Sequence, residues 1–294
     1  MSPVRAVVLD HAGEPALAEL PEPGGEGELV RVRACGLCGT DVQKIGRAAS
    51  GTVLGHEVVA EREDGSRAVL VHHLPCGECA RCRAGHESTC ERFPAATIVP
   101  GGFAERARAL EAIALPDGIP DDVATFAEPL ACVLRALDRL PHGRVLVVGC
   151  GFTGLLFAQA LVQRGDEVLA SDLLSERFEL ARRYGAREPD GPVDAAVLCA
   201  HAGLDDALAA LEPGGTLLVF SWLTKPAPLD LEAVLRRELS IVGSCSATPG
   251  AMRDAIALLP ELDPVPTVTL PLERFAEGVD LYRRHEAVKV VYAP

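Results

Sequence analysis

The chain has 294 residues, with 28 Lys or Arg and 42 Asp or Glu, which gives a formal net charge of −14. A chain of this length is expected to form two domains or one large one, and its hydrophobic fraction of 48% supplies enough apolar material for a core. The acidic balance disfavours nucleic acid as a partner, because phosphate binding relies on clustered Lys and Arg.

The first part of the chain is predicted to be rich in β-strand. Alternating apolar residues bounded by turn-forming segments predict strands at 4–9, 29–34, 53–61 and 67–72. An irregular lobe is expected over 76–90, where Cys, Gly, Arg and Glu dominate. Apolar residues at helical spacing predict a helix over 121–140, with Pro129 near its start or at a kink.

After Pro141 the pattern changes to strands that alternate with helices. Strands are expected at 144–148, 167–171, 193–199, 216–220 and 240–243. Helices are expected at 155–163, 175–184, 204–211 and 250–259. Short β-like pieces at 265–270 and 288–292 close the chain. The alternation predicts a parallel sheet covered on both faces, inserted as an α/β domain into a β-rich domain.

A glycine-rich loop connects the first strand and helix of this α/β region. Gly149 allows the tight turn, Gly151 the close approach of a diphosphate, and Gly154 the packing of the helix on the strand. Phe152 and Thr153 complete the loop and belong to the predicted cofactor site. The diphosphate of a dinucleotide would lie at the positive end of the helix. A glycine turn that binds nothing is the alternative, which the flanking strand and helix disfavour.

An acidic residue follows the next predicted strand. Asp172 lies 23 positions after Gly149, which suits a carboxylate that hydrogen-bonds the adenosine ribose hydroxyls. Such a carboxylate repels a 2′-phosphate, so NAD is favoured over NADP. Arg177 is close enough in sequence to reach the same ribose, which tempers this preference, but NAD is still expected.

Ten cysteines are an unusual number for a chain with no secretory pattern at its N-terminus. We expect a cytoplasmic protein with no membrane partner, since no apolar run reaches the ~18 residues that span a bilayer. A reducing compartment disfavours structural disulfides, so clustered cysteines indicate metal or redox chemistry.

One cluster places four cysteines within 15 residues: Cys76, Cys79, Cys82 and Cys90. Thiolates bind zinc tetrahedrally, and with all four positions filled the ion would be structural. An iron–sulfur cluster is the alternative, but no Pro follows the last cysteine and the seven-residue gap departs from ferredoxin spacing. Unligated thiols on such a loop would be easily oxidised.

A second group lies upstream, where Cys35 and Cys38 form a Cys-x-x-Cys pair that is typical of a redox pair or of half a zinc site. The segment C-G-L-C-G-T-D at 35–41, the G-H-E at 55–57, the four-cysteine lobe, the F-A-E-P-L-A at 126–131 and the glycine loop follow one another along the chain. In this order they resemble the zinc-dependent medium-chain alcohol and polyol dehydrogenases along nearly the whole sequence.

The resemblance implies an α/β fold with a doubly wound Rossmann domain at 138–244. It implies a β-rich, GroES-like catalytic domain formed by 1–137 and 245–294, with the structural zinc lobe at 76–90. It further implies two zinc ions per chain and NAD-dependent interconversion of a secondary alcohol or polyol and its ketone. The implied partners are this small-molecule alcohol or ketone and further copies of the chain, as a homodimer or homotetramer.

The resemblance also implies that Cys38, His56 and an acid hold a catalytic zinc, with Cys35 only a core residue of its strand. Glu57 is a direct ligand in many polyol dehydrogenases of the family. Glu128 stands where many alcohol dehydrogenases place a second cysteine. We expect a site of Cys38, His56 and Glu57, with Glu128 a ligand or a partner to bound water.

In the family the hydroxyl at the Thr40 position accepts the alcohol's proton and passes it toward the ribose and a histidine. Gln43 stands where that histidine is expected, and glutamine does not titrate, so the proton must leave through Lys44, solvent or another route. Asp41 is expected to orient the ligands. A threonine that merely ends a strand is the alternative for Thr40.

A non-catalytic NAD- and zinc-binding sensor or interaction protein is the alternative function. The connections at 42–56 and 60–72 are short for the family, and they ordinarily help to enclose the substrate. Against this alternative stands the complete set of Cys38, Thr40, His56 and Glu57, which a structural protein does not need.

Overall fold

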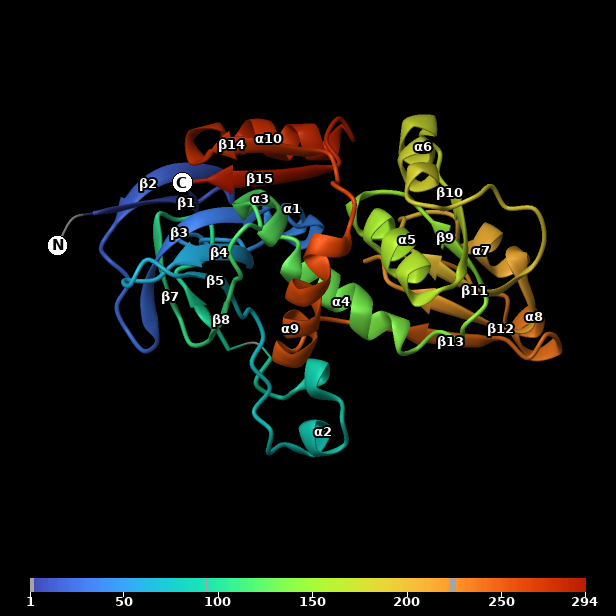
Figure 1. Cartoon of the computed structure of the whole chain (residues 1–294). Helices are drawn as coiled ribbons and strands as arrows, with labels where there is room; N and C mark the ends of the chain where they lie inside the picture. Colours follow the sequence, from blue (N-terminus) through green and yellow to red (C-terminus); the bar gives the residue numbers. More distant parts are fainter. Residues whose placement is uncertain (1–2, 94, 223–225) are drawn as a thin grey trace. The chain divides into compact units, whose positions relative to one another are not determined.

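A computed structural model describes residues 3–93, 95–222 and 226–294, and the chain divides into two compact units (Figure 1). Unit 1 comprises Met1–Ala131 and Ala247–Pro294, and unit 2 comprises Cys132–Ser246. The first boundary between them falls inside helix α4 (Ala127–Leu137). Within the described ranges, no helix has the length and apolar character needed to cross a membrane.

Unit 1 is built on a mainly antiparallel sheet that has eight strands among the described residues. Its main path runs β14 (Thr267–Pro271), β15 (Lys289–Ala293), β3 (Glu28–Gly36), β4 (Glu57–Glu61), β5 (Arg67–Leu70) and β8 (Ala112–Ala114). The long strand β3 also pairs with β7 (Arg106–Ala109), which pairs with β6 (Ile98–Val99). A separate hairpin joins β1 (Val4–Leu9) and β2 (Pro15–Leu20). Strand β3 therefore lies in the middle of the sheet, between β15 and β4.

Aromatic rings fill the core of unit 1 beneath helix α10 (Phe275–Arg283), which packs on β14 and β15 (Figure 1). The ring of Phe103 lies 4.9 Å from that of Phe275 and 5.3 Å from that of Tyr292, both nearly edge-on. The hydroxyl of Tyr292 donates to the Phe275 carbonyl at 2.7 Å, which satisfies the one polar atom of this buried ring. Gly278 is required here, because a Cβ would overlap that hydroxyl.

The remaining helices of unit 1 are short. They are α1 (Gly39–Lys44), α2 (Ala80–Arg83), α3 (Asp121–Ala124) and α9 (Pro249–Leu258), with 3-10 turns at Glu87–Thr89, Leu259–Glu261 and Leu272–Arg274. The single helix expected over 121–140 is in fact two, α3 and α4, and Pro129 lies in the first turn of α4, where a missing backbone N–H costs nothing.

Unit 2 is a parallel sheet of five strands within the described residues. The order is β10 (Glu167–Ser171), β9 (Arg144–Val148), β11 (Val193–Leu198), β12 (Leu211–Val219) and β13 (Ser240–Gly243). Its helices are α5 (Phe152–Arg164), α6 (Ser175–Arg183), α7 (Leu204–Ala210) and α8 (Leu231–Arg236). Successive residues of β9, such as Val147 and Val148, are all buried, as expected for a sheet covered on both faces.

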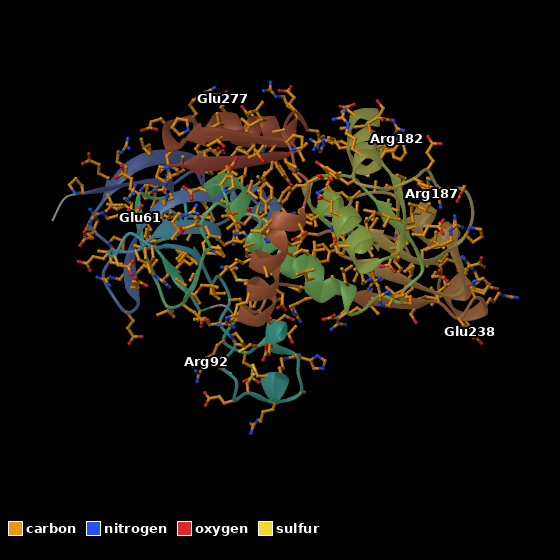
Figure 2. All side chains as sticks on the ribbon, viewed as in Figure 1. Glu61, Arg92, Arg182, Arg187, Glu238 and Glu277 are labelled. Atoms are coloured by element: carbon orange, nitrogen blue, oxygen red, sulfur yellow. The ribbon has the colours of Figure 1, made fainter. Side chains whose placement is uncertain are left out.

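The order of unit 2 is that of a dinucleotide-binding sheet, 3-2-1-4-5-6, without a full strand at the position of strand 3. At this edge a single bridge joins Leu169 to Arg187. Arg187, labelled in Figure 2, forms an ion pair with Glu167, and Arg144 donates to the same carboxylate at 3.0 Å. Charged side chains on an edge strand hinder pairing with another chain.

The sequence missed several elements whose residues lack a clear period, namely β2, β6, β7, β8, α1, α8 and α10. The strand expected over 53–61 begins only at Glu57, because residues 54–56 form a loop against Gly102 and Phe103. Most other strands and helices lie within a few residues of their predicted ranges.

Candidate functional site

The pairing of β3 with β4 creates the first candidate site, in unit 1. Strand β3 ends at Gly36, which pairs with Glu57 at the start of β4 in the antiparallel register. Cys38 follows two residues after the end of one strand, and His56 precedes the start of the other. Residues next to the paired ends of antiparallel neighbours are close in space, although 18 positions separate these two in the sequence.

One ligand atom from each of Cys38, His56 and Glu57 lies within 4.8 Å of the other two. His56 and Glu57 are buried, whereas Cys38 is partly exposed. A thiolate, an imidazole and a carboxylate are all zinc ligands, and catalytic zinc sites combine three protein ligands with an open fourth position. The donor set therefore fits a catalytic zinc ion.

Asp41 is fully buried behind this cluster and orients it. Its carboxylate accepts hydrogen bonds from the backbone N–H of Cys38 at 3.1 Å and of Gly55 at 3.2 Å. His56 Nδ1 lies 3.4 Å from Asp41 Oδ1, so a carboxylate determines the orientation of the ring, as is common behind metal-ligating histidines. Burial opposes charge on both groups, yet their pairing raises the pKa of His56 well above its ordinary value and lowers that of Asp41.

A buried lysine contacts the third member of the cluster. Lys289 Nζ pairs with Glu57 Oε2 and donates to the Leu37 carbonyl at 3.2 Å, and the side chains of both paired residues are only 2% exposed. Lys289 lies on β15 and Glu57 on β4, so the pair reaches across the intervening end of β3. Gly36 makes room for it: a Cβ there would overlap Glu57 Oε2 and lie 3.0 Å from Lys289 Cε.

Sequence reasoning missed Lys289. The available signal was a single lysine within the apolar run at 288–292, since a charged residue in a buried strand needs a partner.

Three other residues discussed for this site, Thr40, Cys35 and Glu128, are not among the three clustered ligands. Thr40, on helix α1 rather than at a strand end, donates its hydroxyl to Cys38 Sγ at 3.3 Å. Cys35 is fully buried, and burial raises the pKa of its thiol well above the ordinary value. Glu128 is buried in the first turn of α4 and is not one of the three clustered ligands.

The second candidate metal site is the lobe at 76–90, where one Sγ atom from each of Cys76, Cys79, Cys82 and Cys90 lies within 4.8 Å of the others. Cys76 Sγ lies 4.0 Å from Cys82 Sγ, close to the edge of about 3.8 Å that Zn–S bonds of about 2.3 Å give a tetrahedron. Backbone N–H groups point at three of the sulfurs, as from Cys76 to Cys90 at 3.3 Å. Such donors stabilise thiolates and lower the pKa of Cys79 to about 6.

The candidate dinucleotide site in unit 2 is the glycine loop between β9 and α5. Gly149 has a φ of 94°, and a Cβ there would lie 2.7 Å from the Cβ of Ala200. A Cβ on Gly154 would overlap the Gly149 carbonyl, so helix α5 packs too closely for any larger residue. At Gly151, by contrast, nothing lies within 4 Å of the Cβ position, which leaves space for an approaching group. Phe152 begins the helix at this loop.

Asp172 follows the end of β10 and contacts the glycine loop directly. Its carboxylate accepts from the backbone N–H of Cys150 at 2.6 Å and from that of Leu174 at 2.8 Å. Arg177 on α6 is 7% exposed, and burial lowers the pKa of its guanidinium although Asp172 and Glu176 oppose this. The acid is therefore held at the loop, as a group that contacts the ribose must be.

Comparisons with known proteins identify the family. A model of the alcohol dehydrogenase GroES-like domain matches residues 25–121. The chain is 33% identical over 289 residues to a D-altritol 5-dehydrogenase of Agrobacterium fabrum, with 83% of this chain and 84% of that protein covered. It is 31% identical over 320 residues to an L-threonine 3-dehydrogenase of Deinococcus radiodurans, covering 93% and 92%. A solved structure of a candidate zinc-binding dehydrogenase from Sinorhizobium meliloti, bound to NADP, matches with a TM-score of 0.88 at 25% identity over all of both chains.

The chain belongs to the zinc-type medium-chain dehydrogenase family. It is an oxidoreductase of the alcohol and polyol dehydrogenase class, which interconverts alcohols and ketones with a nicotinamide dinucleotide. The predicted fold class, a parallel Rossmann sheet with a β-rich GroES-like domain, is confirmed.

Proposed function

We propose that the chain is a zinc-dependent dehydrogenase that transfers hydride between a secondary alcohol or polyol and NAD. The observation that carries this proposal is the approach of Cys38, His56 and Glu57 to within 4.8 Å of one another. Three ligands of this chemistry leave one position open for substrate. A zinc ion held there supplies polarisation of the alcohol oxygen.

In this proposal the chain's own residues bind the metal ion, orient its ligands and accept the proton of the alcohol. Cys38, His56 and Glu57 bind the ion, and Asp41 holds the His56 ring in place through the 3.4 Å contact. Thr40 is the acceptor of the alcohol's proton, since its hydroxyl lies 3.3 Å from Cys38 Sγ and so beside the ligands. We propose that Glu128 is a further ligand or the partner of bound water.

The proposed proton route differs from the one described above for the family. Gln43 stands where the family has a histidine, and glutamine does not titrate. From Thr40 the proton would leave to solvent or to the exposed Lys44. Proton release then requires that water reach Thr40. With water as the acceptor, this step needs no titrating histidine.

The proposed cofactor is NAD, held at Gly149, Gly151, Phe152, Thr153 and Gly154. Asp172 is the basis of the preference over NADP, because its carboxylate binds ribose hydroxyls and repels a 2′-phosphate. Arg177, which lies near Asp172, favours the phosphate instead. The Asp172→Ala variant should therefore lose discrimination between NAD and NADP, measured as the ratio of the two kcat/KM values. An unchanged ratio contradicts this assignment.

The proposed second zinc is structural and is held by Cys76, Cys79, Cys82 and Cys90, which leave no coordination position open. The lobe has its own small helix, α2, whose first residues follow Cys79. We infer that the ion orders this lobe, because the lobe contains little apolar material of its own.

The relatives suggest the substrate class to test. One is named for a polyol and another for threonine, and both compounds carry a polar group next to a secondary alcohol. A panel of polyols, secondary alcohols and β-hydroxy amino acids with NAD, followed at the absorbance of the reduced nicotinamide, should show turnover with at least one of them.

Metal analysis and kinetics of matched cysteine variants test the proposal. The protein should contain two zinc ions per chain, and both Cys38→Ser and Cys76→Ser should contain one. Only Cys38→Ser should lose turnover while the fold is kept, and the exposed Cys245→Ser serves as the control with both ions and full turnover. A single zinc that Cys76→Ser removes contradicts the catalytic site. NAD binding without turnover on any substrate favours the non-catalytic sensor.

A further inference from the structure

Two consecutive histidines follow strand β5 and turn to opposite sides. His73 faces the lobe at 76–90: its Nε2 lies 3.0 Å from the Glu87 carbonyl, and its ring packs 4.4 Å from that of Phe93. His72 faces the candidate metal cluster instead, with its ring 4.7 Å from the His56 ring and tilted by 37°. Alternation along an extended backbone produces this arrangement.

The backbone of His72 is held by a hydrogen bond, and its ring lies against the His56 ring. The Thr97 hydroxyl donates to the His72 carbonyl at 2.6 Å and fixes the backbone. Among the described residues, neither ring nitrogen of His72 has a hydrogen-bond partner, and the ring is only partly buried. A ring nitrogen in this position is satisfied by water or by a ligand, since leaving it unpaired costs free energy.

The imidazole of His72 carries two ring nitrogens that can donate to or accept from a polar group of a ligand. Because Thr97 fixes its backbone and its ring lies against the His56 ring, His72 presents these nitrogens at a defined position beside the candidate metal ligands.

We propose that His72 is a specificity-determining residue that hydrogen-bonds a second hydroxyl or amino group on the carbon next to the one oxidised. The proposal rests on the proposed function, in which the reacting oxygen lies at Cys38, His56 and Glu57. His72 packs on one of these three ligands, so only a polar group close to the reacting carbon reaches it. A substrate without that group leaves the imidazole unpaired and is disfavoured.

Two ring-preserving variants test the proposal in the zinc-loaded protein. His72→Phe keeps a ring against His56 and removes both nitrogens, whereas His73→Phe makes the same change in the neighbouring ring that faces the lobe. The assay is the ratio of kcat/KM for 2,3-butanediol to that for 2-butanol, both with NAD. We expect this ratio to fall about tenfold in His72→Phe, or about 1.4 kcal/mol, and to stay unchanged in His73→Phe.

A binding measurement separates this inference from the proposed function. With cobalt(II) in place of zinc, the visible spectrum reports the approach of an alcohol to the metal without turnover. The dissociation constant of 2,3-butanediol should rise about tenfold in His72→Phe, with the metal content unchanged. If the wild-type protein binds the diol in this way and His72→Phe binds it more weakly, but neither oxidises an alcohol, the proposed function fails while the contact of His72 with the second polar group is kept.

Three results overturn the inference. An unchanged diol-to-alcohol ratio in His72→Phe excludes a contact with the second hydroxyl, and if both kcat/KM values fall equally, His72 acts only by packing on His56. Loss of one metal ion from His72→Phe makes His72 a metal ligand. A cobalt spectrum that neither alcohol perturbs excludes an alcohol bound at the metal beside His72.

Discussion

Replacing Lys289 with Met should destabilise unit 1 far more than the loss of an ordinary ion pair. The side chains of Lys289 and Glu57 are each 2% exposed, so the substitution leaves a carboxylate buried without its cation. Breaking a buried pair by removing one partner typically costs about 3–5 kcal/mol, because the remaining charge is uncompensated. We expect a loss in this range for the metal-free protein.

A double variant separates charge compensation from simple packing. In Lys289→Met combined with Glu57→Gln no net charge remains, so most of the lost stability should return, with a coupling of about 0.5–3 kcal/mol. Bound zinc should reduce the cost of Lys289→Met alone, since a cation then faces Glu57 from the other side. Calorimetric unfolding with and without zinc measures both effects.

An exposed ion pair in unit 2 provides the matched control. Arg187 and Glu167 also pair through a carboxylate, but their side chains are 58% and 40% exposed. Arg187→Met should therefore cost less than about 1 kcal/mol. If Lys289→Met costs no more than this control, or if the double variant is as unstable as the single one, the argument from burial is wrong.

Three further predictions concern the other sites. Gly154→Ala should destabilise unit 2, because the added Cβ overlaps the loop backbone, whereas Gly151→Ala should unfold normally and lose NAD affinity in a fluorescence titration. Arg164 and a backbone N–H lower the pKa of Asp166 against the effect of burial, so this carboxylate stabilises the fold above its unfolded pKa of about 3.9 and loses that contribution as the pH falls. Asp166→Asn should flatten the acid side of a stability–pH curve, and an unaltered slope contradicts this. Cys76→Ser should make the lobe a site of rapid proteolysis, and protection equal to wild type excludes a metal-ordered lobe.

Local patterns explain what the sequence revealed about unit 2. Apart from α8, the strands and helices there have a hydrophobic period or a glycine at a defined offset, and both signals act over fewer than about twenty residues. Alternating apolar residues also predicted the β-rich domain, but its shortest strands carry weaker signals, and the family resemblance added its GroES-like identity. No strand was predicted around Arg187, and the structure has only a single bridge there, because this segment is too short and polar to extend a strand.

The sequence predicted only part of the candidate metal site, because some of its residues are far apart along the chain. Cys38, His56 and Glu57 belong to motifs that are recognisable in isolation. The residues that contact these ligands belong to no such motif. Lys289 is 232 positions from Glu57, and His72 follows a strand whose register no local pattern determines.

Gly36 shows how such distant contacts give meaning to a motif residue. Between Cys35 and Cys38, the glycine reads as a loop residue that makes a Cys-x-x-Cys pair possible. In the fold it ends β3 and pairs with Glu57, and a side chain there would occupy the volume of the Glu57–Lys289 pair. The two cysteines therefore have different roles. Cys35 is buried in strand β3, whereas Cys38 lies beyond the end of the strand, next to His56 and Glu57. Gly36→Ala should consequently disturb the Glu57 carboxylate while leaving both cysteines intact. A lower zinc affinity in this variant, with its thiol count unchanged, would show that the motif serves the carboxylate as well as the thiolate.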